Sequence, residues 1–468
     1  MLAVVLAGAF MAGIDVTIVN VALPAIRVGL GASNSVLEWV LSGYSLAFGL
    51  ALVPAGRVGD YWGHKRVFVT GLVLFTLASV ACGLAQNGAE LVAARVIQGL
   101  AAGIFTPSIP ATIRIVFAQA ERGKAFSLYG AVWGVSAAIG PTLCGLIILV
   151  GGETDGWRWV FLVNLPVGIL AVIAALRLLP ETERAVRHNT DAVGLFLLTA
   201  ALLLLLVPLV EGQSLGWPAW TAWSMGASAS ILVLLALWEV REERRKREPL
   251  IPPRVVSHPD FAVGAVISLV FFAAFTSVFF IITIVWQIGY GRGALETGLS
   301  VLPWSVASFV GASVSHRLAA VMGRGVLLLG AGAMTVGLVG IYLVLRLEDG
   351  GPSAWAMALP FLLGGLGTGF FIAPNQAYVL STVSPQQAGA AAGVLNTAQR
   401  IGSAVGIALI GTVLFGSLSI APGPNAMAIA FSHAAQNAIL VNIGLIVLCF
   451  LLTLLLPATA VRKGSASG

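Results

Sequence analysis

Asp15 is the residue of this sequence whose chemistry most needs an explanation. It lies in residues 11–24 (MAGIDVTIVNVALP), within an apolar run that begins at Met1. If that run crosses a bilayer, the carboxylate sits near mid-membrane, where a charge costs about 2.5 to 3.5 kcal/mol. An acid kept at that cost is suited to binding and releasing a proton, and a nearby cation would offset the cost.

Arg95 is the candidate for that cation. In a later apolar run, Arg95 and Gln98 share a helix face at i, i+3, while Gly99 and Gly103 form a small surface that another helix can approach closely. Arg95 could instead snorkel to the nearby interface. Counted along their helices, Asp15 and Arg95 differ in depth by about 6 Å, within reach of an arginine if the helices are neighbours. We expect Asp15 to bind the proton and Arg95 to tune it.

A polar segment after the second apolar run combines glycines with charges. Glycine suits a turn that needs positive φ, and the aspartate could cap a helix N-terminus or pair with a basic neighbour. The alternative is an ordinary basic loop, but the joint spacing favours a latch that holds two helices in one state. The predicted latch residues are Gly56, Asp60, Gly63, Lys65 and Arg66.

One apolar run carries Gly130, Gly134, Gly140, Pro141 and Gly145. A single Gly-Pro pair would be a simple kink, which membrane helices tolerate. Four glycines with a proline suggest instead a bendable helix against which another helix rocks. Static close packing is the alternative interpretation.

The composition is that of an integral membrane protein. Only 9% of the 468 residues are charged and 58% are apolar, whereas soluble domains carry about 25% charged residues. Apolar runs of about 20 residues recur, which is typical of spanning helices and not of barrel strands. We expect an all-α membrane protein with 14 transmembrane helices, the fourth at 89–112 and the fifth at 125–149. We expect no soluble catalytic domain and hence no enzyme. The three cysteines lie in apolar runs without metal-ligand spacing, so no disulfide, metal or cofactor is expected.

The net charge of +6 orients the chain and does not indicate nucleic-acid binding. Most of the 25 Lys and Arg residues fall in alternate loops between the expected spans. By the positive-inside rule those loops are cytoplasmic. The sequence therefore predicts a multi-pass protein of the cell membrane, with both termini in the cytoplasm.

An internal repeat divides the chain. A shift of 266 residues superimposes Gly99 on Gly365 and Gly140 on Gly406 without gaps. Spans one to six thus repeat as spans nine to fourteen, and both copies enter from the same side, as in parallel repeats. We expect a six-helix bundle at 1–180, two inserted helices with cytoplasmic loops at 181–260, and a second six-helix bundle with a short tail at 261–468.

Other polar residues have less certain roles. Asn396 and Arg400 share a face of the expected thirteenth span, where cavity lining and helix–helix contact are both open. Glu38 and Glu211 fall near expected outer span ends, where exposure at the interface is the simplest interpretation. Glu211 is still the candidate for a second proton site. The possible cavity residues are Gln98, Asn396, Arg400 and Glu211.

Together these motifs resemble those of the major facilitator superfamily, and specifically its fourteen-spanner drug:proton antiporter family. That family's loop pattern Gly-x-x-x-Asp-x-x-Gly-x-[Lys/Arg]-[Lys/Arg] corresponds to the latch residues, and its first-span motif matches residues 15–24 throughout. Its span-four arginine corresponds to Arg95. Its Gly-Pro-x-x-Gly-Gly signature is met by Gly140, Pro141 and Gly145, although Cys144 replaces the first paired glycine.

The resemblance implies alternating access, in which two bundles rock about a central site and expel a small amphipathic compound as protons enter. The expected partners are that compound, protons and the lipid bilayer, with no nucleic acid and a monomeric protein. The chain has no Gly-x-x-x-x-Gly-Lys-[Ser/Thr] phosphate loop, so no ATP drive is expected. Two alternatives stay open: a proton symporter that imports a nutrient, and a membrane sensor that transports nothing.

Overall fold

The fold is a bundle of long helices. The computed structural model describes residues 1–152, 154–181, 191–212, 215–245, 247, 249–251, 253–348, 351–381, 383, 388–420, 422 and 425–457, and every regular element within these ranges is helical. A helix satisfies all its backbone hydrogen bonds internally, which the apolar interior of a membrane requires.

The helices fall into two groups joined by an inserted pair. The first group is α1 (Leu2–Leu30), α2 (Asn34–Trp62), α3 (His64–Leu84), α4 (Gly88–Phe105), α5 (Ser108–Val116), α6 (Gln119–Gly151), α7 (Gly156–Leu162) and α8 (Asn164–Leu178). The inserted pair is α9 (Ala192–Glu211) and α10 (Ala219–Arg244), followed by the short α11 (Pro253–Val256). The second group is α12 (Pro259–Ile284), the π-helix η1 (Val285–Gly289), α13 (Ala294–Ser300), α14 (Leu302–Met322), α15 (Gly325–Leu347), α16 (Ala354–Ser381), α17 (Ala388–Gly416) and α18 (Ala426–Thr453).

Thirteen helical stretches in the described ranges are long and apolar enough to span a membrane. The predicted fifth span coincides with α6, of which the apolar segment Ile139–Gly151 is shorter, and several side chains of α6 lie outside the description. The predicted all-helical membrane fold is confirmed, whereas the count of fourteen spans stays a prediction.

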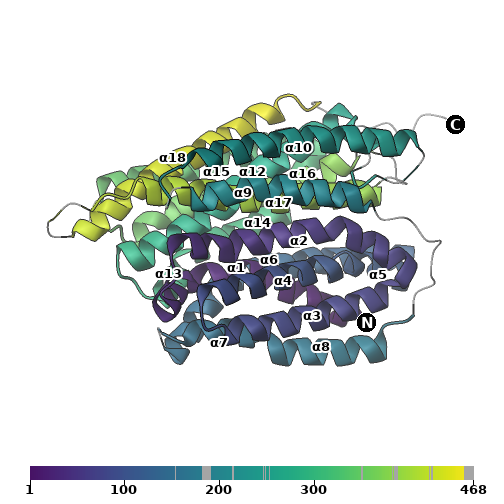
Figure 1. The fold of residues 1–468 in the computed structure, drawn as a ribbon, viewed down its shortest axis with the longest axis horizontal. Coiled ribbons are helices and arrows are strands. Elements are labelled where there is room, and N and C mark those ends of the chain that lie inside the picture. The colour runs from purple at the N-terminus through teal and green to yellow at the C-terminus, as the bar shows by residue number, and fades with distance from the viewer. Residues whose placement is uncertain are drawn as a thin grey trace.

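The two groups repeat one packing pattern. In the first group α1 packs on α6, α2 on α4 and α3 on α8; in the second, α12 packs on α17, α14 on α16 and α15 on α18. In both groups, glycines form the closest contacts between the corresponding helices. Gly99 and Gly103 of α4 lie against backbone carbonyls of α2, and Gly365 and Gly369 of α16 lie against backbone carbonyls of α14. In Figure 1 the first group occupies the lower part of the view, and α12 and α15–α18 the upper part.

The groups meet along α2 and α17 and, elsewhere, between α6 and α13–α14. The inserted helix α9 lies beside both α2 and α17. Ser35 Oγ of α2 donates to the Val210 carbonyl at 3.5 Å, and Thr412 Oγ1 of α17 donates to the Leu209 carbonyl at 2.5 Å. The insert is thus fastened to both groups.

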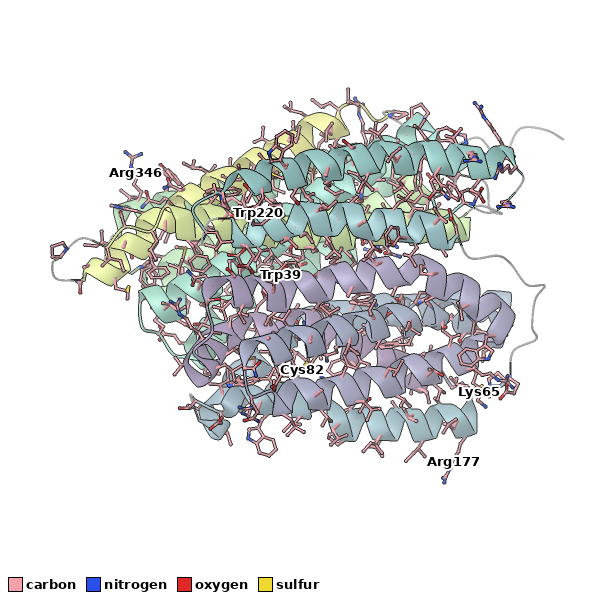
Figure 2. The ribbon with its side chains drawn as sticks, viewed as in Figure 1. Trp39, Lys65, Cys82, Arg177, Trp220 and Arg346 are labelled. Carbon is pink, nitrogen blue, oxygen red and sulfur yellow. The ribbon has the colours of Figure 1, made fainter. Side chains whose placement is uncertain are left out.

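Labelled basic residues in Figure 2 identify the two ends of the bundle. Lys65 and Arg177 lie at one end and Arg346 at the other (Figure 2). We call the end with Lys65 and Arg177 the basic end. Helix α14 runs toward it, because α14 ends one short turn before α15 begins and α15 runs to Arg346.

Candidate functional site

Asp15 and Arg95 form a buried ion pair between α1 and α4. Arg95 Nη1 lies 2.6 Å from Asp15 Oδ2, and the two side chains are 1% and 0% exposed. The pair explains how a carboxylate is kept inside the bundle, because a buried charge requires a partner and further hydrogen bonds. Sequence position alone left open whether these helices are neighbours; the structure brings the two residues together.

Gln98 bridges the ion pair. Its carboxamide nitrogen donates to Asp15 Oδ1 at 3.0 Å, and its oxygen accepts from Arg95 Nη1 at 2.8 Å. The same nitrogen donates to Ser79 Oγ at 3.1 Å, and Asn164 Nδ2 donates to that hydroxyl at 3.0 Å. Helices α1, α3, α4 and α8 therefore share one polar network.

Arg95 is held on its other sides by α2. Its Nε donates to the Val40 carbonyl at 3.1 Å, and its guanidinium lies 3.9 Å from the centre of the Tyr44 ring. Because a planar guanidinium can stack on a ring and hydrogen-bond at its edge, both contacts are made at once. Arg95 is thereby fixed as a link between α1, α2 and α4.

A cavity of about 670 Å³ lies between the two groups of helices, within the range of small-molecule sites. Arg95, Thr17 and Asn20 line it from the first group. Aromatic and hydroxyl side chains line it from the second group, namely Phe275, Thr276, Phe279, Thr283, Trp304, Ser305, Ser308, Phe309 and Ser313. The lining follows α14 as far as His316, so the cavity extends toward the basic end.

At the opposite end of the cavity, α6 packs closely against α13. A Cβ at Gly145 would lie 2.5 Å from Leu295 Cα, and a Cβ at Gly298 would lie 2.5 Å from the Pro141 carbonyl oxygen. Gly140 packs against Thr17 of α1. The glycine motif of α6 therefore forms a close contact between the groups. Gly130 and Gly134 lie in the same helix, but their surroundings are outside the described part.

The predicted latch lies where α2 turns into α3. Gly63 adopts φ 97°, a conformation that favours glycine. Lys65 Nζ and Arg66 Nε lie 3.7 and 3.6 Å from the carboxylate of Glu181, which follows α8. The basic pair thus contacts the end of its own group. Gly56 lies within α2, and the Asp60 side chain is outside the described part.

None of the four possible cavity residues is among those that line the cavity. Gln98 belongs to the ion-pair network, and Glu211 Oε1 accepts from Trp39 Nε1 at 3.1 Å. Asn396 is partly buried in α17. Arg400 reaches from α17 to the first group, with its guanidinium 4.1 Å from the centre of the Phe48 ring.

Glu38 corrects one interpretation from the sequence. It was expected at an exposed span end, but it is only 3% exposed and packs against Gly411 of α17. Its Oε2 makes no hydrogen bond to a described residue. The expected exposure is wrong because α17 of the second group, invisible in the local sequence, covers this face of α2.

Several site residues were not predicted. Ser79, Asn164 and the lining of α12 and α14 gave only weak signals, since hydroxyls and phenylalanines are ordinary in apolar helices. A repeat-based alignment could have found Trp304 and Ser308, because a shift of 260 residues places them on Tyr44 and Phe48. His316 was not predicted either, because a lone histidine near a span end carries no specific signal.

Comparisons with known proteins identify relatives over most of the chain. Residues 5–407 match the Major Facilitator Superfamily. The chain is 38% identical to a probable actinorhodin transporter of Streptomyces coelicolor, over 89% of this chain and 72% of that one. It is 30% identical to a tetracenomycin C resistance and export protein of Streptomyces glaucescens, over 87% and 74% of the two chains.

A solved structure shares the fold. The D-xylose–proton symporter superimposes with a TM-score of 0.69 at 14% identity, covering 98% of this chain and 97% of that one. At this identity the likeness concerns the fold alone. The match across the chain and the relatives of at least 30% identity confirm the predicted resemblance: this chain belongs to the major facilitator superfamily, and its relatives include antibiotic exporters.

Proposed function

We propose that this protein is a proton-coupled antiporter that exports small amphipathic antibiotics or drugs from the cytoplasm by alternating access. The observation that carries the proposal is the buried Asp15–Arg95 pair, whose arginine lines the cavity between the two groups. The relatives described as an actinorhodin transporter and a tetracenomycin C exporter favour antibiotic export over nutrient import. No cofactor is required by this mechanism.

Asp15 is the proposed proton carrier and Arg95 its switch. Arg95 touches both the carboxylate and the cavity, so movement of the guanidinium toward the cavity would leave Asp15 without its cation. A buried carboxylate without a cation binds a proton, and return of the arginine releases it. Gln98 contacts both groups and would keep the carboxylate oriented throughout.

Alternating access requires the closed contact between α6 and α13 to open. The basic end is assigned to the cytoplasm by the positive-inside rule, so the cavity described here faces inward. Opening at the other end would separate Gly145 from Leu295 and Gly298 from Pro141. We further propose that the bundles at 1–180 and 261–468 move as units, that the loop of Gly56, Asp60, Gly63, Lys65 and Arg66 favours one state, and that the protein acts as a monomer.

The test is transport by purified protein in proteoliposomes under an imposed pH gradient. Asp15→Asn should still fold but no longer move a dye against its gradient, because the amide cannot take up a proton. Asp155→Asn is the matched control, since Asp155 is 68% exposed and pairs only with Arg158 among the described residues. Gradient-driven efflux by Asp15→Asn equal to wild type would refute the assignment, and dye uptake coupled to proton entry would indicate a symporter.

A further inference from the structure

The charges around the cavity are unbalanced. Arg95 and His316 line it, and no Asp or Glu is among the described lining residues. The charge of Arg95 is matched by Asp15, which lies behind it. An unmatched carboxylate would favour an organic cation, and the described lining presents none.

Arg400 adds a positive charge for which the described residues supply no counter-ion. Among the described residues, no carboxylate lies within 4.0 Å of its guanidinium and no group accepts a hydrogen bond from it. The guanidinium lies 4.1 Å from the centre of the Phe48 ring and 5.7 Å from that of Trp133. Glu38 is ten residues from Phe48 along α2, or about 15 Å.

Arg400 is placed beside the cavity. Ser403, one turn further along α17, lines the cavity, as does Tyr44, one turn from Phe48 on α2. The Arg400 backbone is fixed, because a Cβ at Gly49 would lie 2.8 Å from Arg400 Cβ. The five N–H donors of a guanidinium suit a planar oxyanion.

We propose that Arg400 is an anion-binding site of the cavity and that the exported compounds are aromatic acids. The ionised carboxylate, phenolate or enolate of the compound supplies the counter-ion that the described residues do not. The rings of Phe275, Phe279 and Trp304 hold its apolar part. This inference rests on the proposed role of the cavity as the cargo site, but it does not depend on proton coupling.

The test is binding to full-length protein in nanodiscs without any gradient. The probes are 9-anthracenecarboxylate and its methyl ester, which differ only in the charge, and ethidium as an aromatic cation. Wild type should bind the acid about tenfold more tightly than the ester, which is about 1.4 kcal/mol. Arg400→Gln should bind the two equally, and Arg400→Lys should keep part of the preference.

Arg177→Gln is the control, because Arg177 is exposed at the basic end. Equal binding of acid and ester by wild type, an undiminished preference in Arg400→Gln, tighter binding of ethidium than of the acid, or binding of none of the three probes would each overturn the proposal. Loss of acid preference without any effect of Asp15→Asn on transport would support the anion site while refuting the proton carrier.

Discussion

Gln98 shows how a single amide can keep an ion pair in a membrane interior. It contacts both charges, donating to Asp15 and accepting from Arg95. In a medium of low dielectric, each unpaired lone pair or N–H is costly, so a buried pair needs such additional hydrogen bonds. Gln98 is therefore expected to matter for stability as well as for transport.

Gln98→Leu should lower the free energy of unfolding by about 1–3 kcal/mol, because Asp15 and Arg95 each lose a buried partner. Thermal unfolding of the detergent-solubilised protein, followed by tryptophan fluorescence, measures the change. Gln86→Leu is the control, since Gln86 lies exposed between α3 and α4. Equal unfolding temperatures for the two variants would show that the bridge contributes nothing.

Glu38 should behave in the opposite way. Its buried Oε2 has no hydrogen-bond partner among the described residues, and Glu211 is close enough to repel an ionised Glu38. Glu38→Gln keeps the shape and removes the charge, so it should raise the free energy of unfolding by about 1 kcal/mol or more. Denaturation at neutral pH is the measurement, with Glu121→Gln at an exposed site as control. A destabilised Glu38→Gln would show that the carboxylate has a favourable partner.

At the scale of single residues, the sequence predicts an ion pair more readily than the hydrogen-bond network around it. Asp15 and Arg95 were anticipated because charges are rare in apolar runs and their depths agree. Ser79 and Asn164 were not, because which faces of α3 and α8 meet α4 depends on tertiary packing. For Arg400 the sequence left both cavity lining and helix–helix contact open, and the structure places the aromatic rings of Phe48 and Trp133 beside its guanidinium.

Helix α6 packs against its own group and also forms a contact that must change if the two groups move. Its glycine motif makes contact with α1 through Gly140 and with α13 through Gly145. A Cβ at Gly140 would meet the Thr17 side chain, whereas a Cβ at Gly145 would meet the backbone of Ala294 and Leu295 and force the two backbones apart. The contact at Gly145 is between the two groups, so its disruption changes their relative position and leaves the first group internally intact.

Gly145→Ala should therefore shift the population away from the state closed at α6 and α13. Overpacking of this kind costs about 1–3 kcal/mol, or roughly tenfold in population and in transport rate. Spin labels on cysteines introduced at Thr154 and Gly293 measure the separation, since the three natural cysteines are buried.

Gly226→Ala on α10 is the matched control, because a Cβ there meets no atom within 4 Å. It should transport normally. A label distance in Gly145→Ala identical to that of wild type would mean that the neighbouring α13 yields without moving the groups.

Hydropathy predicts which residues cross the membrane better than it predicts where each helix begins and ends. The expected fourth span, 89–112, is two helices, α4 and α5, because Pro107 cannot continue the hydrogen-bond ladder. The expected fifth span, 125–149, is the interior of the longer α6, whose polar first turns continue beyond the apolar segment. Both differences in helix bounds arise because an apolar run indicates which residues lie in the membrane and does not indicate where the backbone hydrogen bonding of a helix is interrupted.

For the whole molecule, the internal repeat was the most informative sequence feature. It anticipated the matching pairs α2–α4 and α14–α16, since the glycines that permit them recur at the same spacing. It could not reveal the cavity, whose walls come from both groups. The repeat also could not predict that α9 packs against α2 and α17, because the inserted pair has no counterpart in the repeat.

The orientation of the whole molecule can be tested by fusions. Alkaline phosphatase fused after Gly351, between α15 and α16, should be active, and phosphatase fused after Gly468 should be inactive while a fluorescent-protein fusion there should fluoresce. The physical reason is that Lys and Arg are retained on the cytoplasmic side. The reverse pattern of activities would invert the assignment of the basic end.

The position of α9 makes the two flanks of the protein unlike for anything dissolved in the lipid. On one flank, α9 covers the seam between α2 and α17. On the other, α6 and α14 contact each other directly, and α13 packs against both. If the protein exports compounds that partition into the bilayer, as proposed above, α9 would block their approach along the flank of α2 and α17. The inserted pair therefore makes the two flanks unequal.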